Sequence, residues 1–332
     1  MTRATAIRLL CMLLTLAVWH TMTQAQASES AACVGLDQKF REEVAKGRTA
    51  QAETLLADSL APVARSAQLS CVGLILSRTA VQMAVSGRMD EAEKFAEQSI
   101  HVLGESFSPD DVVFFRPLHI VASARFERGE VRKARQAFER MKTIRIERPE
   151  ERAMLSGFSA TLLSAEGRYR EAESEYLLAV QAWEKAGRGD TADTGTVLNA
   201  LGSLYFREHR LDDARRVLDL AFGIFTSAKD AVPLDLFKLL EVRAAMHVKL
   251  QEWRKAEQDL RDAVAMTDRL PGLDPGTLGR ALADYVYVLR KNHRRREARS
   301  IEERAAGLHG QAITNNVIDT TELGAHSKGS AK

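Results

Sequence analysis

The chain has 332 residues, with 47 Lys and Arg against 45 Asp and Glu, and a formal net charge of +2 at pH 7. Proteins that bind nucleic acid through its phosphates carry a clustered basic excess, so this balance disfavours nucleic acid as a partner. The chain has three cysteines, Cys11, Cys33 and Cys71.

Residues 1–27 have the pattern of a cleaved secretory signal. Arg3 and Arg8 precede an apolar stretch that begins at Leu9 and ends at Trp19, and small residues at 25 and 27 offer a cleavage site. The stretch is about half of the roughly 20 residues that a membrane span needs. We expect export to the periplasm or the extracellular space, with no stable membrane span after cleavage. An uncleaved membrane anchor is the alternative.

Residues 28–309 repeat with a period near 42. A small residue recurs after a turn, at Ala52, Ala92, Ala134, Ala172, Ala214, Ala256 and Ala298. The position five residues earlier holds Gly47, Gly87, Gly129, Gly167, His209, Gln251 and His293. The position twelve residues earlier is mostly small, with Ala80, Ala122, Ala160, Gly202 and Ala244. A fixed period of this length indicates a solenoid of stacked repeats.

Each repeat is interpreted as two antiparallel helices joined by a tight turn. Glycine at the turn tolerates the left-handed conformation that ends a helix. The two small positions would face each other where the helices cross, because close approach requires small side chains. The periodicity stops near Gly310, and residues 310–332 are predicted to be a disordered polar tail.

The fifth repeat carries a family resemblance in Leu198-Asn199-Ala200-Leu201-Gly202-Ser203-Leu204-Tyr205 and, after the turn, Arg210-Leu211-Asp212-Asp213-Ala214. It resembles the tetratricopeptide repeat, and the long period is similar to the repeats of kinesin light chain and its bacterial relatives. The resemblance covers about residues 34–308. It implies an all-α fold, a right-handed α-α superhelix of about six to seven helix-turn-helix repeats, with the first helices lining a concave groove.

A partner site is expected in the C-terminal half of that groove. Positions fifteen, eleven and eight before the repeat alanine share one helical face, and basic residues lie one turn earlier. The candidate groove residues are Asn199, Ser203, Phe206, Lys238, Arg280, Tyr287 and Arg290. The resemblance implies that Asn199 hydrogen-bonds a peptide backbone. The basic residues suit an acidic or C-terminal-carboxylate peptide, and the alternative is that they are ordinary solvated surface.

Two cysteines remain after the signal, Cys33 and Cys71, near the start of the first helices of neighbouring repeats. In an exported chain they could form a disulfide that links the first repeat to the second. Two buried, reduced thiols are the alternative.

No motif for catalysis, a metal or a cofactor is found in the sequence. Acidic pairs such as Asp90-Glu91 begin second helices, where the helix dipole favours them. The sequence therefore predicts an exported, non-catalytic scaffold without a cofactor that binds a protein or peptide. The alternatives are a structural or regulatory subunit of a larger envelope assembly, or the sensor partner of a separate enzyme chain.

Overall fold

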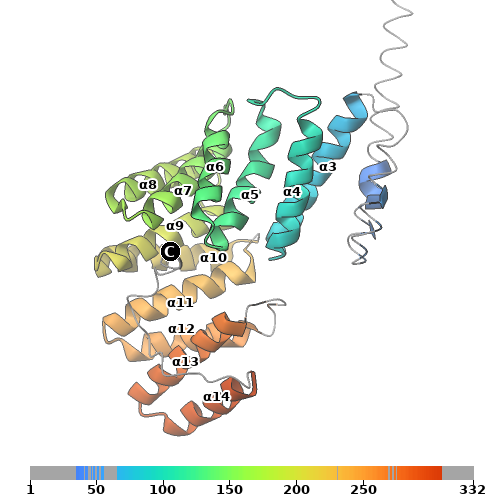
Figure 1. Ribbon diagram of the computed structural model, residues 1–332. Coiled ribbons are helices and arrows are strands. Elements are labelled where there is room, and N and C mark those ends of the chain that lie inside the picture. The colour runs from blue at the N-terminus through green and yellow to red at the C-terminus, as the bar shows by residue number, and fades with distance from the viewer. Residues whose placement is uncertain are drawn as a thin grey trace, which may run out of the picture. The chain divides into compact units, whose positions relative to one another are not determined.

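The computed structural model describes residues 35–40, 66–229, 231–267, 270, 273 and 275–308, together with single positions between 42 and 55 (Figure 1). The predicted signal and polar tail lie outside the described residues. Every regular element within those ranges is a helix, which confirms the all-α prediction. None of the helices described here has both the length and the apolar composition needed to cross a membrane.

The chain divides into two compact units, one containing residues 1–84 and 89–121 and the other residues 85–88 and 122–332. The first unit contains most of α3 (Ser66–Val85), α4 (Met89–Leu103), the short η1 (Val112–Phe114) and the start of α5 (Phe115–Glu127). The Ser99 hydroxyl of α4 donates a 2.7 Å hydrogen bond to the Gly73 carbonyl of α3. Phe40, at a position that is small in other repeats, is fully buried and meets Phe95 edge-on at 6.1 Å between ring centroids.

The second unit is a series of helix pairs (Figure 1). After the end of α5 its helices are α6 (Val131–Lys142), α7 (Pro149–Ala165), α8 (Tyr169–Lys185), α9 (Ala192–Arg207), α10 (Leu211–Ser227), α11 (Pro233–Lys249), α12 (Trp253–Met266), α13 (Pro275–Lys291) and α14 (Arg295–Leu308). The first helix of each pair packs most extensively on the second, and the second packs on the first helix of the next pair. Four such pairs, α7–α8, α9–α10, α11–α12 and α13–α14, lie among the described residues of this unit. The predicted first repeat falls mostly outside the described residues.

The same turn joins the two helices in each pair. In α9 the N–H of Arg210 bonds the Tyr205 carbonyl at 2.9 Å, and the N–H of His209 bonds the Phe206 carbonyl at 3.1 Å. These two bonds form a Schellman cap, which requires a left-handed residue. His209 has a φ of 60°, and Gln251 and His293 have φ values of 57° and 61°. The predicted turn position therefore adopts the left-handed conformation even where it is not glycine.

The predicted helix crossings are confirmed. The repeat alanines from Ala92 to Ala298, and the small residues twelve positions before them, are almost completely buried. Gly202 shows how close the helices come: a Cβ there would lie 2.5 Å from the Leu218 side chain of α10. Two prolines begin first helices, Pro149 in α7 and Pro233 in α11, because proline is well suited to the first helical position.

Candidate binding face

The first helices α9, α11 and α13 hold the predicted groove residues, all within the second unit. Lys238 of α11 and Arg280 of α13 occupy the same repeat position, and both are exposed. The Lys238 Nζ lies 3.9 Å from Glu127 Oε1 at the end of α5, and both side chains are about half exposed. Arg280 donates a 3.0 Å hydrogen bond to Thr277 of its own helix. These two basic side chains are thus available on one side of α11 and α13.

Asn199 and Ser203 lie half-buried in α9. The Ser203 hydroxyl donates 2.9 Å to the Asn199 carbonyl in the preceding turn. The Asn199 side-chain Oδ1 is buried and has no hydrogen-bond partner among the described residues. A buried polar atom without a partner is costly, so a hydrogen-bond donor to Asn199 Oδ1 would stabilise α9.

The remaining three candidates do not join this group as expected. Phe206 is only 3% exposed and belongs to the hydrophobic core around α9 and α10. Tyr287 is half-buried and packs edge-on against Trp253 of α12, with ring centroids 6.2 Å apart. Arg290 is exposed and pairs with Glu302 of α14, inside the last repeat. The residue eight positions before the repeat alanine is therefore buried in α9. Among α9, α11 and α13, this position is exposed only in α13.

Carboxyl groups that were not among the candidates lie beside the basic ones. Burial raises the pKa of Glu241 to about 7, and the neighbouring Asp284 raises it further while Arg280 and Lys238 oppose the shift. Burial likewise raises the pKa of Asp284 to about 7, opposed by Arg280. The pKa of Asp235 is also raised, mainly by burial. Neither Glu241 nor Asp284 has a hydrogen bond or ion pair within the described part of the chain.

The face along α11 and α13 is consequently mixed in charge and is not uniformly basic. Glu241 lies fifteen residues before Ala256, at one of the predicted groove positions. Its place in the sequence did not indicate that its carboxyl group is partly buried and unpaired. Because both carboxyls titrate near neutrality, the net charge of this face changes around pH 7.

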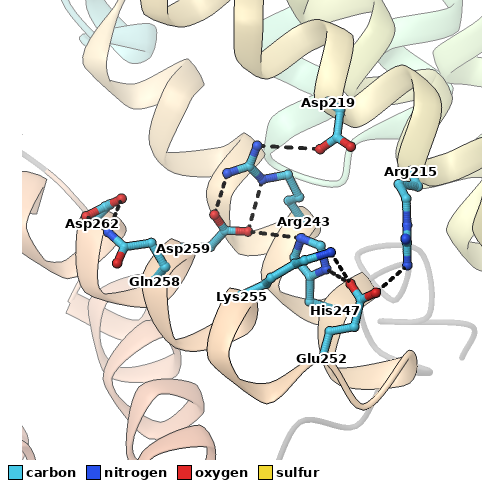
Figure 2. A network of polar contacts seen from close by, with 9 residues as sticks. All are labelled: Arg215, Asp219, Arg243, His247, Glu252, Lys255, Gln258, Asp259 and Asp262. Atoms are coloured by element: carbon cyan, nitrogen blue, oxygen red, sulfur yellow. Dashed lines mark hydrogen bonds and ion pairs between the residues drawn. The ribbon is translucent and has the colours of Figure 1, made fainter.

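A buried polar network lies behind this face, between α10, α11 and the start of α12 (Figure 2). Arg243 forms a bidentate pair with Asp259, with Nε 3.0 Å from Oδ2, and stacks over the Phe222 ring at 3.6 Å. The side chains of Arg243 and Asp259 are 12% and 3% exposed. A bidentate, well-satisfied pair of this kind holds helices in one register.

His247 connects this pair to the turn before α12. Its Nδ1 lies 2.7 Å from Glu252 Oε2 and its Nε2 lies 3.7 Å from Asp259 Oδ2. Burial lowers the pKa of His247, although both carboxylates favour the charged ring. Glu252 also accepts from Arg215 of α10 at 2.8 Å and from Lys255 at 3.2 Å. These contacts connect α10, α11 and α12 to one another.

One polar contact recurs where successive repeats meet. The contact joins two side chains. One belongs to the residue directly after a repeat alanine, and the other belongs to the residue four positions before the repeat alanine of the following repeat. These joint pairs are Glu173–Arg210, Arg215–Glu252 and Glu257–Arg294. At the joint between α6 and α8 the same two positions hold Arg135 and Arg168, and both arginines pair with Glu166 instead.

Cys71 is half-buried in α3. Cys33 lies outside the described residues, so its pairing with Cys71 stays a prediction.

Comparison with known proteins supports the repeat fold. Residues 150–227, which cover α7 to α10, match the tetratricopeptide-repeat family. No curated protein sequence matches the chain.

Solved structures resemble the chain over most of its length. BtubC (BKLC) from P. vanneervenii has a TM-score of 0.51 and 19% identity, covering 70% of this chain and 90% of that one. A Rap protein complexed with competence and sporulation factor has a TM-score of 0.57 and 10% identity, covering 84% and 76%. A tetratricopeptide repeat protein from Parabacteroides merdae has a TM-score of 0.50 and 16% identity, covering 89% and 99%. The chain is a protein of tetratricopeptide-repeat fold, and its α7–α10 segment matches that family in sequence.

Proposed function

We propose that the chain is an exported, non-catalytic scaffold that binds a protein or peptide partner along the first helices of its C-terminal repeats. The observation that carries this proposal is the row of polar groups without internal partners on α9, α11 and α13: Asn199 Oδ1, Glu241 and Asp284. A folded protein seldom leaves partly buried polar groups unpaired. A partner that supplies hydrogen bonds to them explains why they are retained.

The exposed Lys238 and Arg280 favour an acidic segment or a C-terminal carboxylate as the bound group. Below pH 7 Glu241 and Asp284 are protonated, so they no longer offset the charges of Lys238 and Arg280. Above pH 7 both carboxyls ionise and repel an acidic partner. Binding of an acidic segment is therefore proposed to be tighter at pH 6 than at pH 8.

The test is capture of partners from envelope and secreted fractions by the purified chain and by the double variant Lys238→Ala/Arg280→Ala. A matched control is Arg290→Ala, because Arg290 pairs with Glu302 within its own repeat. A partner captured by the unaltered chain and by Arg290→Ala, but not by the double variant, supports the proposal. Equal capture by all three chains moves the site elsewhere, and no captured partner refutes the scaffold role.

Export is proposed on the signal-like residues 1–27, and the disulfide between Cys33 and Cys71 accompanies it. The mass of the chain recovered from the envelope, measured without reduction, tests both. A chain that begins near residue 28 and gains two mass units on reduction agrees with the proposal. A retained N-terminus refutes cleavage, and two free thiols refute the disulfide.

A structural role in a larger assembly is favoured by one feature of the second helices. Leu178 of α8 and Leu220 of α10 occupy the same repeat position, and they are 51% and 56% exposed. Exposed leucines at the same position of successive second helices are apolar surface that contact with another subunit would cover. Light scattering of the purified chain and of Leu178→Ser/Leu220→Ser tests this role, which requires an oligomer that the variant loses.

A further inference from the structure

A cavity of about 410 Å³ lies between α6, α7 and α8, within the second unit. This volume is in the range of small-ligand and side-chain pockets. The α7 residues that line it are Leu155, Ser156, Ser159 and Leu163. They lie at other repeat positions than the groove residues of α9, α11 and α13, so the cavity is separate from the binding face described above.

The cavity has an apolar wall and free hydroxyl groups. Phe138 of α6 is buried, and Leu155 and Leu163 are half-buried. Ser156 and Ser159 also line the cavity, and their side chains make no hydrogen bond within the described residues. A ligand with both an apolar part and several hydrogen-bond donors matches this lining.

The charges that line the cavity are unequally satisfied. Its three basic residues, Arg135, Lys142 and Arg168, all pair with carboxylates. Among its acidic residues, Glu139 pairs with Lys142, and Glu171 accepts from Arg168 at 2.7 Å. Glu175 of α8 is half-buried and has no hydrogen bond or ion pair in the described structure. Glu175 is therefore the one carboxylate of this lining that has no basic partner in the described structure.

The cavity lies at a joint whose two joint positions do not pair with each other. At the next three joints an acid and an arginine connect neighbouring repeats across the same two positions. Between α6 and α8 these positions hold Arg135 and Arg168, which repel each other and turn to Glu166. This joint lacks the direct contact that closes the others, and the cavity lies beside it.

We propose that this α6–α8 cavity binds an arginine side chain presented by a partner protein. The aliphatic stem of arginine would cover Phe138 and Leu155, as long basic side chains cover apolar surface elsewhere. Its guanidinium would pair with Glu175 and donate to Ser156 and Ser159, which uses the planar set of five donors that this group carries. The inference adds a second partner contact and does not depend on the proposed binding face.

The test uses a fluorescein-labelled peptide, Ala-Leu-Arg-Leu-Ala with blocked ends, and the same peptide with Glu in place of Arg. Fluorescence anisotropy is followed as the purified chain is added. The arginine peptide is expected to bind and the glutamate peptide is not. Glu175→Gln is expected to weaken binding about tenfold or more, as for loss of a hydrogen bond to a charged group. No binding of the arginine peptide, or equal binding to Glu175→Gln, overturns the proposal.

Two further variants locate the effect. Glu184→Gln makes the same charge change on α8 at an exposed residue outside the cavity, and it should bind as the unaltered chain does. Lys238→Ala/Arg280→Ala should also keep arginine-peptide binding, so failure of the proposed binding face would be seen separately. Loss of binding in either variant overturns the cavity assignment. Unfolding in urea should be unchanged by Glu175→Gln, and a clear destabilisation would show a structural role instead.

Discussion

Arg215 donates a 2.8 Å hydrogen bond to Glu252 across the joint between α10 and α12, with the charges of this joint pair exchanged relative to its neighbours. The joints on either side place the acid first, as Glu173 before Arg210 and Glu257 before Arg294. The ion pair is thus present at each of these three joints, although the acid and the arginine exchange positions at the middle joint. Repeats that differ in this order do not fit equally well on every neighbour, because a wrong order places like charges together.

The joint pair Arg215–Glu252 is expected to couple the two repeats measurably. Arg215→Gln and Glu252→Gln are each expected to destabilise the chain, and the double variant less than their sum. For a partly buried pair in a network, the coupling should be about 0.5–1.5 kcal/mol and should fall with added salt. Urea unfolding gives all four free energies.

The control cycle uses Lys142 and Glu139, whose side chains are both 51% exposed. An exposed pair contributes little, so its coupling should be near zero. A coupling for Arg215–Glu252 as small as that of the control pair would contradict the role of the joint pair.

Substitutions at the left-handed turn residues test whether the backbone conformation of the turn limits stability. Replacing glycine and introducing glycine should have opposite effects. Gly167→Ala should destabilise by about 1–2 kcal/mol, because an L side chain in the left-handed region meets the following carbonyl. His209→Gly should be neutral or stabilising at the equivalent turn, since it relieves that strain in α9–α10. Thermal unfolding of both variants checks the pair. Equal effects of the two changes would mean that the turn conformation does not limit stability.

The crossing of α9 and α10 predicts a steric effect at one glycine. Gly202→Ala puts a methyl group 2.5 Å from Leu218, and overpacking of this kind costs about 1–3 kcal/mol. Gly223→Ala in α10 is the matched control, because a Cβ there meets nothing within 4 Å. It should stabilise by about 0.5–1 kcal/mol, as alanine is a better helix residue than glycine. Denaturant midpoints that move in the same direction for both would refute the crossing argument.

The repeat pattern predicted local structure well because it depends on backbone geometry that every unit shares. Aligning His209 with Gly167 was enough to expect a left-handed residue, although histidine itself gives no such signal. The small residues at crossings were equally readable, since close helix approach limits side-chain size in each repeat.

The binding face was harder to read because exposure depends on the neighbouring repeat. Phe206 and Arg290 occupy the same repeat position, yet one is in the core and the other is exposed. The joint pairs were missed for a different reason. The acid and the arginine exchange positions between joints, so each of the two positions contains both acidic and basic residues when the repeats are aligned. The pairing becomes visible only when one position of a repeat is compared with the other position of the following repeat.

The raised pKa of Asp284 predicts a pH-dependent stability. Its folded pKa of about 7 lies above the ordinary value of 3.8, so between pH 4 and pH 7 the folded chain binds the proton more tightly than the unfolded chain. Stability from this group is present at low pH and is lost as pH rises through about 7.

Asp284→Asn removes the titration. Relative to the unaltered chain, the variant should gain about 2–3 kcal/mol more at pH 8 than at pH 5, because about two pH units of the loss lie between pH 5 and pH 7. The same comparison with Asp212→Asn, an exposed acid at the start of α10, should show no pH-dependent gain. A difference between Asp284→Asn and the unaltered chain that stays constant from pH 5 to pH 8 would show that Asp284 is not a buried, unpaired carboxyl.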